Sequence, residues 1–263
     1  MNEIKLAALA AAGLLAAAPS AHATATASAT LTNFHYQVFD LDPNDGIDAA
    51  VTFASGAYAY ARADDVGIST GTNGTYQDAS GVIGSALSVS AVEGASNASA
   101  LTTAGDPAGA GAGPDASSFA SAAGAGNFAS GGGYLLNSSF TLTPRTLLVF
   151  TASPSGVSVA TTSLGESAYA YAYLQINAAD NSQTAYSGAY ANAYSDGTSY
   201  STLPTFVTAS FTNLANAEVA GYAYAYAYAS AQGVAAIPEP GSYALMLAGL
   251  LSVGLAVRRR RTR

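Results

Sequence analysis

Residues 167–177 read SAYAYAYLQIN, and this stretch decides the fold of the chain. Alanine alternates with tyrosine, which is the pattern of a β-strand, because successive side chains of a strand point to opposite faces. The alanine positions continue into Leu174 and Ile176, whereas the tyrosine positions continue into Gln175 and Asn177. We therefore predict that alanine faces the core of the protein and that tyrosine faces outward.

The same alternation returns in residues 57–61, 189–194 and 221–229. Polar residues share the tyrosine positions in each segment, so we extend the same orientation to all of them. If these strands are neighbours, their rings form one outer face, which we expect to comprise Tyr58, Tyr60, Tyr169, Tyr171, Tyr173, Tyr222, Tyr224, Tyr226 and Tyr228. A large exposed aromatic face often marks a binding surface, here for polysaccharide or for another copy of the chain. The alternative is that the rings pack on one another and stiffen the sheet.

Turn signals and period-2 alternation continue along most of the chain, which predicts an all-β body. This pattern favours two packed antiparallel sheets, forming a sandwich or a jelly-roll-like body. Residues 104–133 are rich in Gly, Ala and Ser, and we expect a long loop there. We expect strands at residues 31–40, 49–61, 82–92, 134–143, 146–153, 156–162, 166–177, 184–194, 205–213 and 218–231.

The first 23 residues predict a signal peptide. An apolar run follows Lys5, and Ala21 and Ala23 fit the small-x-small pattern of a cleavage site. We expect export and cleavage after Ala23, so that the body comprises residues 24–236. A retained N-terminal anchor is the alternative, although the apolar run at 6–18 is short for a membrane span.

Residues 237–263 form a distinct C-terminal segment in three parts. Pro238, Glu239 and Pro240 precede an apolar run at 243–257, and five of the residues 258–263 are arginine. As a helix the apolar run would span roughly 22 Å, which predicts a short transmembrane helix. The arginines would stay on the cytoplasmic side, leaving the body outside. The alternative is a buried core helix, but such a helix rarely ends in an arginine cluster.

This three-part segment resembles the PEP-CTERM sorting signal of exported proteins in Gram-negative bacteria that make extracellular polysaccharide. The resemblance implies that exosortase, a membrane protease-transpeptidase, recognises and cuts the tail. Pro238, Glu239 and Pro240 would then be the recognition element, as substrate residues and not catalytic ones. The resemblance also implies that the inner membrane holds the protein by its C-terminal helix before the body reaches the cell surface or the extracellular matrix.

Charge and composition exclude several classes of function. Apart from the two terminal segments, the chain has 14 acidic residues and two basic ones, Arg62 and Arg145, so its net charge is near −12. Nucleic acid is therefore not expected as a partner. The chain has no cysteine, and His35 is the only histidine of the body, which leaves no thiolate site or histidine-based triad. The carboxylates of Asp64, Asp65, Glu93, Glu166 and Glu218 show no spacing typical of a glycosidase, so we predict no enzyme.

An acidic turn follows the first predicted strand. Oxygen ligands at alternating positions are typical of a Ca²⁺ site, and the candidate ligands are Asp40, Asp42, Asn44, Asp45 and Asp48. The match to a calcium loop is imperfect, since the glycine is one place late and no bidentate glutamate follows. The alternative is a Pro-Asn-Asp-Gly hairpin turn whose aspartates accept local amide hydrogen bonds. No other cofactor is expected.

Together these features predict an exported structural protein of the cell surface or of the extracellular matrix of a biofilm. The alternative is a polysaccharide-binding module that uses the tyrosine face and is stabilised by calcium.

Overall fold

The computed structural model describes residues 23–64, 74–124, 126–234 and 249–250. Ala23–Val234 form one compact unit, which is the body of the protein. The predicted signal peptide up to residue 22, the motif at 238–240 and the arginine cluster lie outside the described residues, as does Asp65. Of the predicted helix at 243–257, only Gly249 and Leu250 are described, both with helical backbone. Within these ranges, no helix has the length and apolar character needed to cross a membrane.

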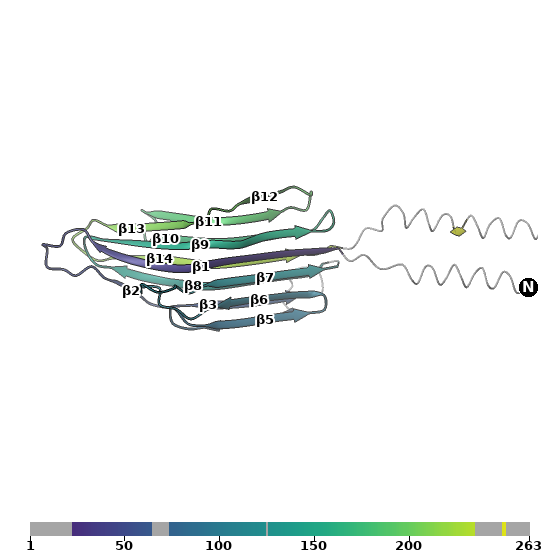
Figure 1. Cartoon of the computed structure of the whole chain (residues 1–263), viewed down its shortest axis with the longest axis horizontal. Helices are drawn as coiled ribbons and strands as arrows, with labels where there is room; N and C mark the ends of the chain where they lie inside the picture. Colours follow the sequence, from purple (N-terminus) through teal and green to yellow (C-terminus); the bar gives the residue numbers. More distant parts are fainter. Residues whose placement is uncertain (1–22, 65–73, 125, 235–248, 251–263) are drawn as a thin grey trace, which may run out of the picture. The chain divides into compact units, whose positions relative to one another are not determined.

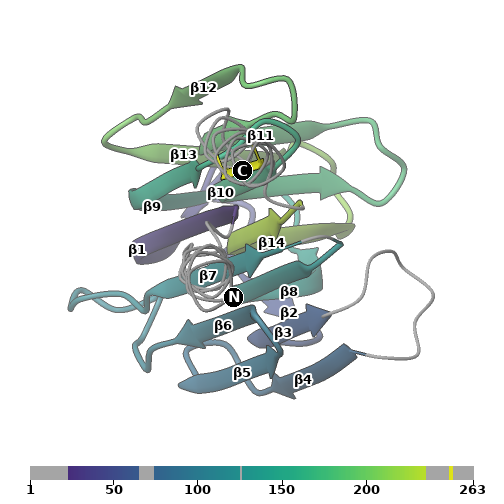
Figure 2. The ribbon, with the colours of Figure 1, turned by 90° about the vertical axis from the view of Figure 1, so that its right-hand side faces the viewer.

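The body consists of two antiparallel sheets that pack face to face (Figures 1 and 2). The six-stranded sheet has the order β13 (Val207–Asn213), β9 (Thr146–Thr161), β1 (Thr24–Asp40), β7 (Ala116–Ala123), β6 (Ser96–Thr102) and β5 (Leu87–Glu93). The eight-stranded sheet has the order β12 (Ser199–Thr202), β11 (Thr184–Ala193), β10 (Ser167–Ala178), β14 (Val219–Gln232), β8 (Phe128–Leu142), β3 (Tyr58–Asp64) and β4 (Gly74–Ser80), and β2 (Val51–Phe53) also pairs with β8.

The predicted all-β sandwich is confirmed. Three runs of consecutive strands stay within one sheet, namely β2 to β4, β5 to β7 and β10 to β12. The other connections between consecutive strands pass from one sheet to the other. The unit has its own buried core, which is what an independently folding domain requires.

The predicted loop at 104–133 is wrong over nearly half of its length. Strand β7 lies inside it, and β8 begins six residues before its predicted start at Tyr134. In β7 the buried positions alternate with exposed or half-buried ones, so alanine and serine supply a regular strand despite their low complexity. Residues 131–133 are all glycine, and the opposite sheet explains two of them. A Cβ on Gly131 would lie 2.6 Å from the Ser99 carbonyl oxygen, and one on Gly133 would lie 2.9 Å from that of Leu101.

Other strand boundaries also differ from the prediction. The strand expected at 49–61 is two short strands, β2 and β3, whereas the two strands expected at 146–153 and 156–162 are one strand, β9. Strands β4, β6 and β12 were not predicted. These are short strands at or near the sheet edges, and their sequences lack large apolar residues at alternating positions.

The core changes in character along the strands. Where β1 begins, the buried side chains are alanines such as Ala25, Ala27 and Ala29. Farther along, Phe34 of β1 contacts Phe150 of β9 with ring centroids 5.7 Å apart, and Phe140 contacts Phe211 at 5.4 Å. A core layer of methyl groups is thinner than one of rings. The two sheets therefore approach closely at the alanine end, where the contacts of Gly131 also lie.

Candidate functional site: the tyrosine face

The outward side of the eight-stranded sheet carries a continuous layer of tyrosine side chains, which we call the tyrosine face. In β10 and β14 the register places Tyr171 opposite Tyr228 and Tyr173 opposite Tyr226. Ala170 and Ala172 between them are fully buried, whereas the tyrosines are half-buried. The predicted orientation, with alanine inward and tyrosine outward, is confirmed. All nine predicted tyrosines belong to strands of this one sheet.

One row of rings crosses six neighbouring strands. Tyr76 of β4 contacts Tyr60 of β3 with centroids 6.3 Å apart, and Tyr60 contacts Tyr134 of β8 at 6.4 Å. Tyr134 stacks on Tyr226 of β14 at 5.0 Å. The row continues to β10 and β11 through the contacts of Tyr173 with Tyr226 at 5.5 Å and with Tyr186 at 6.0 Å.

Hydroxyl contacts join further rings at both ends of the sheet. The Tyr58 and Tyr76 hydroxyl oxygens lie 2.7 Å apart, and those of Tyr194 and Tyr200 lie 2.5 Å apart. Sequence reasoning did not place Tyr76, Tyr134 or Tyr200 on the face, because each stands alone outside the alternating segments. The only signal in the sequence is that alternate residues of a strand share one side of the sheet. This signal can be used only when the strand boundaries are known.

Glycine on neighbouring strands makes room for two of the rings. A Cβ on Gly132 would lie 2.6 Å from Tyr60 Cε1, and a Cβ on Gly188 would lie 2.6 Å from Tyr173 Cδ2. Both glycines belong to the tyrosine side of their strands, since Gly132 pairs with Tyr60 and Gly188 with Tyr173. The rings therefore lie down over backbone instead of standing away from the sheet.

The face is uncharged over its centre and partly open to solvent. Four tyrosines at its margins are about half exposed or more: Tyr222 at 48 %, Tyr200 at 51 %, Tyr76 at 53 % and Tyr186 at 69 %. Charged groups appear on the last two strands at one edge, where Arg62 of β3 forms an ion pair of 2.7 Å with Asp64 and Asp78 of β4 lies opposite Tyr60. A flat, neutral surface of rings and hydroxyl groups can stack on apolar faces and exchange hydrogen bonds at its margins.

Burial keeps the phenols of the face protonated. It raises the pKa of Tyr60, Tyr134 and Tyr226 above the ordinary value for tyrosine, and neighbouring phenols add to the rise. The hydrogen bond with Tyr200 raises the pKa of Tyr194 to about 12. At neutral pH these side chains therefore act as neutral donors and acceptors, and not as nucleophiles or bases.

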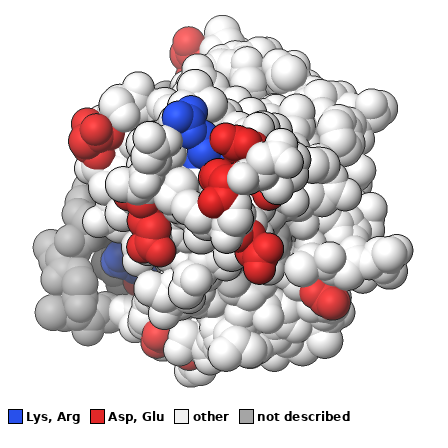
Figure 3. Space-filling model, turned by 90° about the vertical axis from the view of Figure 1, so that its left-hand side faces the viewer, with Lys and Arg blue, Asp and Glu red and all other residues white. Residues whose placement is uncertain are grey.

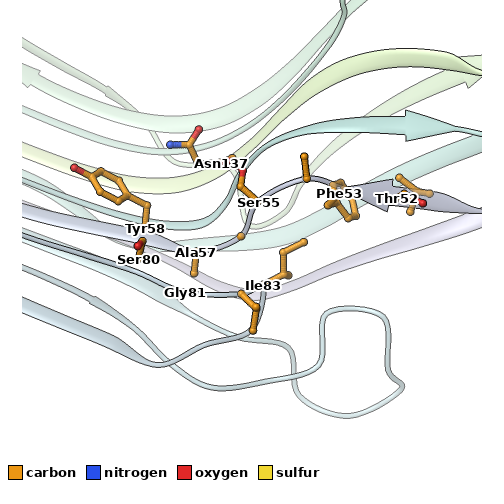
Figure 4. Close-up of a pocket in the computed structure, with 13 residues that line it drawn as sticks. Thr52, Phe53, Ser55, Ala57, Tyr58, Ser80, Gly81, Ile83 and Asn137 are labelled. Carbon is orange, nitrogen blue, oxygen red and sulfur yellow. Dashed lines mark hydrogen bonds between the residues drawn. The ribbon is translucent and has the colours of Figure 1, made fainter.

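A groove borders the tyrosine face at its β3 side (Figure 4). Its volume is about 910 Å³, and it is lined by residues 51–58, residues 80–83 and Asn137. Tyr58 and Asn137 connect it to the face, since Asn137 lies opposite Tyr224 in the sheet. The lining has no charged side chain, and Gly56 is held where an added Cβ would lie 2.4 Å from the Ile83 nitrogen. The groove is therefore a neutral extension of the face.

The acidic turn binds its own backbone. The Asp42 amide donates to Asp40 Oδ1 at 2.9 Å, and the Ile47 amide donates to Asp45 Oδ1 at 2.8 Å. Gly46 has a φ of +74°, as expected of a turn glycine. Figure 3 shows acidic side chains gathered at this end of the body. Across the described residues, no three acidic or histidine side chains come together to hold a metal ion. The two amide hydrogen bonds and the turn glycine are the features that the hairpin-turn alternative predicts.

The other titratable residues considered from the sequence are dispersed. His35 Nε2 lies 3.1 Å from Asn33 Oδ1, Glu93 accepts a hydrogen bond of 2.9 Å from the Thr75 hydroxyl, and Asp64 is paired with Arg62. Glu166 is fully buried and accepts amide hydrogen bonds from the loop that precedes it.

Comparison with known proteins identifies the C-terminal segment. Residues 236–261 match the family described as the PEP-CTERM protein-sorting motif, which includes the predicted Pro238, Glu239 and Pro240. PEP-CTERM motifs are recognised by exosortase, a membrane enzyme. The chain matches none of the curated proteins and none of the solved structures with which it was compared. The match confirms the resemblance drawn from the sequence: the chain carries a PEP-CTERM protein-sorting motif at residues 236–261.

Proposed function

We propose that this protein is a non-catalytic structural component of the cell surface or of the extracellular, exopolysaccharide-containing matrix. The sorting motif at 236–261 supports export and sorting by a C-terminal signal. The signal peptide would be removed after Ala23, and the tail would hold the protein in the inner membrane until exosortase acts on the Pro-Glu-Pro element. The body that remains would be an acidic β-sandwich without cysteine, whose stability needs no disulfide.

The row of six rings across β4, β3, β8, β14, β10 and β11 is the observation that carries the structural role. Each cross-strand aromatic pair contributes roughly 0.2–1 kcal/mol, and the pairs run perpendicular to the strands. They therefore tie together neighbouring strands that backbone hydrogen bonds already join. A sheet reinforced in this way suits a protein that must persist outside the cell.

The alternative function is a polysaccharide-binding module. Its support is the exposure of Tyr76, Tyr186, Tyr200 and Tyr222 around the stacked rings, together with the neutral groove beside Tyr58. Sugar rings present apolar faces and hydroxyl groups, which match tyrosine rings and their hydroxyl margins. The same face could instead contact a second copy of the chain.

Binding of the purified body to an array of bacterial polysaccharides separates these functions. The Tyr171→Ala/Tyr224→Ala variant removes two rings of the face, and Phe119→Ala is the control because Phe119 is exposed on the six-stranded sheet. Binding that the tyrosine variant loses and the control keeps would establish the binding module. Absence of binding to every polysaccharide, with a folded body, would favour the structural role.

Sorting is tested on the protein made by its host cell. Intact mass and cell fractionation are expected to give a body that starts at Thr24, lacks the residues after the Pro-Glu-Pro element and lies outside the inner membrane. The Glu239→Ala variant is expected to keep its tail and remain in the inner membrane. A wild-type protein that keeps its tail in the inner membrane would make it an anchored envelope protein instead.

A further inference from the structure

Glu166 is a buried carboxylate, and neither arginine of the described residues pairs with it. Its side chain is 0 % exposed, and its Oε2 atom accepts hydrogen bonds from the Thr162 amide at 2.5 Å and the Ser163 amide at 2.9 Å. The Oε1 atom has no hydrogen-bond partner among the residues that the structure describes. In the described part of the chain the basic side chains are Arg62, which pairs with Asp64, and Arg145, which donates to Asn216 Oδ1.

A cation close to Glu166 would stabilise its buried carboxylate. Burying an ionised carboxylate without a partner is costly, and native proteins almost always pair such groups. Two amide hydrogen bonds to Oε2 offset part of this cost and leave Oε1 unsatisfied. The body has no lysine, and both of its arginines have other partners among the described residues, so an amino terminus on the body itself is a source of a cation.

Thr24 is the first residue of the predicted mature protein, and the Thr162 hydroxyl group lies between its nitrogen and the Glu166 carboxylate. The Thr24 nitrogen donates to Thr162 Oγ1 at 2.8 Å, and this oxygen lies 3.4 Å from Glu166 Oε2. The antiparallel register of β1 and β9 positions the two threonines, because Ala25 pairs with Thr161, and Thr24 and Thr162 are the residues next to this pair in the two chain segments. The backbone of β1 therefore holds the Thr24 nitrogen close to the carboxylate.

We propose that Glu166 is a built-in binding site for the α-ammonium group that removal of the signal peptide creates on Thr24. The inference rests on the export and cleavage after Ala23 proposed above. Hydrolysis breaks the bond between the Ala23 carbonyl carbon and the Thr24 nitrogen, and water gives its hydroxyl group to the carbonyl and a proton to the nitrogen. The amine takes up one more proton at neutral pH, since its pKa is ordinarily about 8.

Cleavage thus converts the Thr24 nitrogen from a neutral amide, which has one N–H, to an ammonium cation, which has three. One N–H keeps the hydrogen bond to Thr162 Oγ1, and another can turn to the Glu166 carboxylate. Ala23 itself is buried, and its carbonyl accepts a hydrogen bond of 3.1 Å from the Gly124 amide, so its departure also opens space beside Thr24. The pair forms only in the processed protein, which makes the body more stable after export than before it.

The position of the pair gives it a second consequence. Strand β1 begins and β14 ends at the same end of the body (Figure 1). Glu166 accepts hydrogen bonds from the loop at residues 162–165. This loop also lies close to Val234, near the end of β14, since a Cβ on Gly165 would lie 3.3 Å from Val234 Cγ1. The ammonium–carboxylate pair therefore secures the end of the sandwich where both predicted processing segments leave it.

The composition of the chain allows a selective test. Lys5 is the only lysine and lies in the predicted signal peptide, so the α-amine is the only amine that acetylation can modify in the leaderless chain starting at Thr24. Hydroxylamine treatment then reverses any acetylation of tyrosine. Melting temperature is measured for wild type and Glu166→Gln, each with a free and an acetylated amine.

We expect acetylation to lower the melting temperature of the wild-type protein by about 4 °C, as one broken ion pair would in a domain of this size, and to change that of Glu166→Gln much less. Equal shifts in the two proteins would overturn the pairing. If Glu166→Gln does not fold, the rate of acetylation against pH serves instead: a paired amine reacts with a pKa above that of a free Thr-initiated peptide, and an ordinary pKa would overturn the proposal. The intact mass of the exported protein separately reports the cleavage site, so a different first residue would refute the processing step and not the chemistry measured on Thr24.

Discussion

The ring of Tyr60 lies over Gly132 of the neighbouring strand, where an added Cβ would come within 2.6 Å of Tyr60 Cε1. Gly131, the preceding residue, faces the opposite side, where an added Cβ would come within 2.6 Å of the Ser99 carbonyl oxygen. Two adjacent glycines thus serve two different contacts. One accommodates a side chain of the tyrosine face, and the other allows the backbones of the two sheets to approach.

These two glycines should respond differently to the same substitution. Gly131→Ala forces the sheets apart, because backbone atoms of β6 cannot move away singly, and we expect a loss of about 3 kcal/mol in the free energy of unfolding. Gly132→Ala only requires the Tyr60 ring to shift, and we expect a loss of about 1 kcal/mol. Denaturant unfolding of both variants measures the difference. Equal losses would mean that the close approach of the sheets at Gly131 is not what makes glycine necessary.

Alkaline pH should destabilise the protein through the tyrosine face. Burial raises the pKa of Tyr60, Tyr134 and Tyr226, whereas the same residues titrate near pH 10 in the unfolded chain. Below pH 10 they are neutral in both states and stability is complete. Above pH 10 the unfolded chain loses these protons first, so stability falls as pH rises toward the pKa values of the folded protein.

The measurement is the free energy of unfolding between pH 8 and pH 11, followed together with tyrosinate absorbance. Tyr226→Phe, which cannot ionise in either state, should weaken the pH dependence. Tyr222→Phe is the matched control, because Tyr222 lies on the same strand and is 48 % exposed. A Tyr226→Phe protein with the wild-type pH dependence would contradict the prediction.

Leu174 and Tyr173 are neighbours on opposite faces of β10, and they should contribute differently to stability. Leu174 is fully buried in the core, so Leu174→Ala should cost about 2–5 kcal/mol by removing apolar contacts and leaving a cavity. Tyr173→Ala removes ring contacts on the open side and should cost about 1 kcal/mol. Thermal and denaturant unfolding measure both. The reverse order would mean that the tyrosine face, and not the interior, is the main source of stability.

Asn213 holds together the end of the body opposite to Thr24. Its side chain is buried, and Nδ2 donates to the carbonyl oxygens of Leu142 at 3.2 Å, Thr143 at 2.9 Å and Ala217 at 2.9 Å. Asn213→Asp replaces the donor by an acceptor facing these carbonyls, and we expect a loss of about 3 kcal/mol or more in the free energy of unfolding. Asn216→Asp, in the nearby exposed loop, is the control and should change stability little.

The acidic turn should behave as a hydrogen-bonded turn. Asp45→Ala removes the acceptor of the Ile47 amide and should lower the free energy of unfolding by about 1 kcal/mol. Asp45→Asn keeps an acceptor oxygen at the same position and should restore most of the loss. A melting temperature that rises with added calcium and falls with chelator would instead establish the calcium alternative.

The alternating segments determined much of the architecture without reference to tertiary contacts. Alternation is a local property, and in SAYAYAYLQIN the polar and apolar ends of the segment identify which side of the strand faces water. The orientation of Ala170 and Tyr171 was therefore readable from the sequence, as were the all-β class and the two-sheet arrangement. The sorting motif was equally readable, because Pro238, Glu239 and Pro240 are recognised as a linear segment.

Tertiary structure alone decided which strands are neighbours, and with it the continuity of the tyrosine face. Tyr134 joins the two halves of the ring row only because β8 lies between β3 and β14, and no local pattern specifies that order. The Gly/Ala/Ser stretch became β7 and part of β8 for the same reason, since small residues suit a place where two sheets approach closely. Burial of Glu166 beside Thr24 also depends on residues distant in sequence. Side-chain orientation follows from the period of a single strand, whereas pairing and close approach are set by the packing of the whole body.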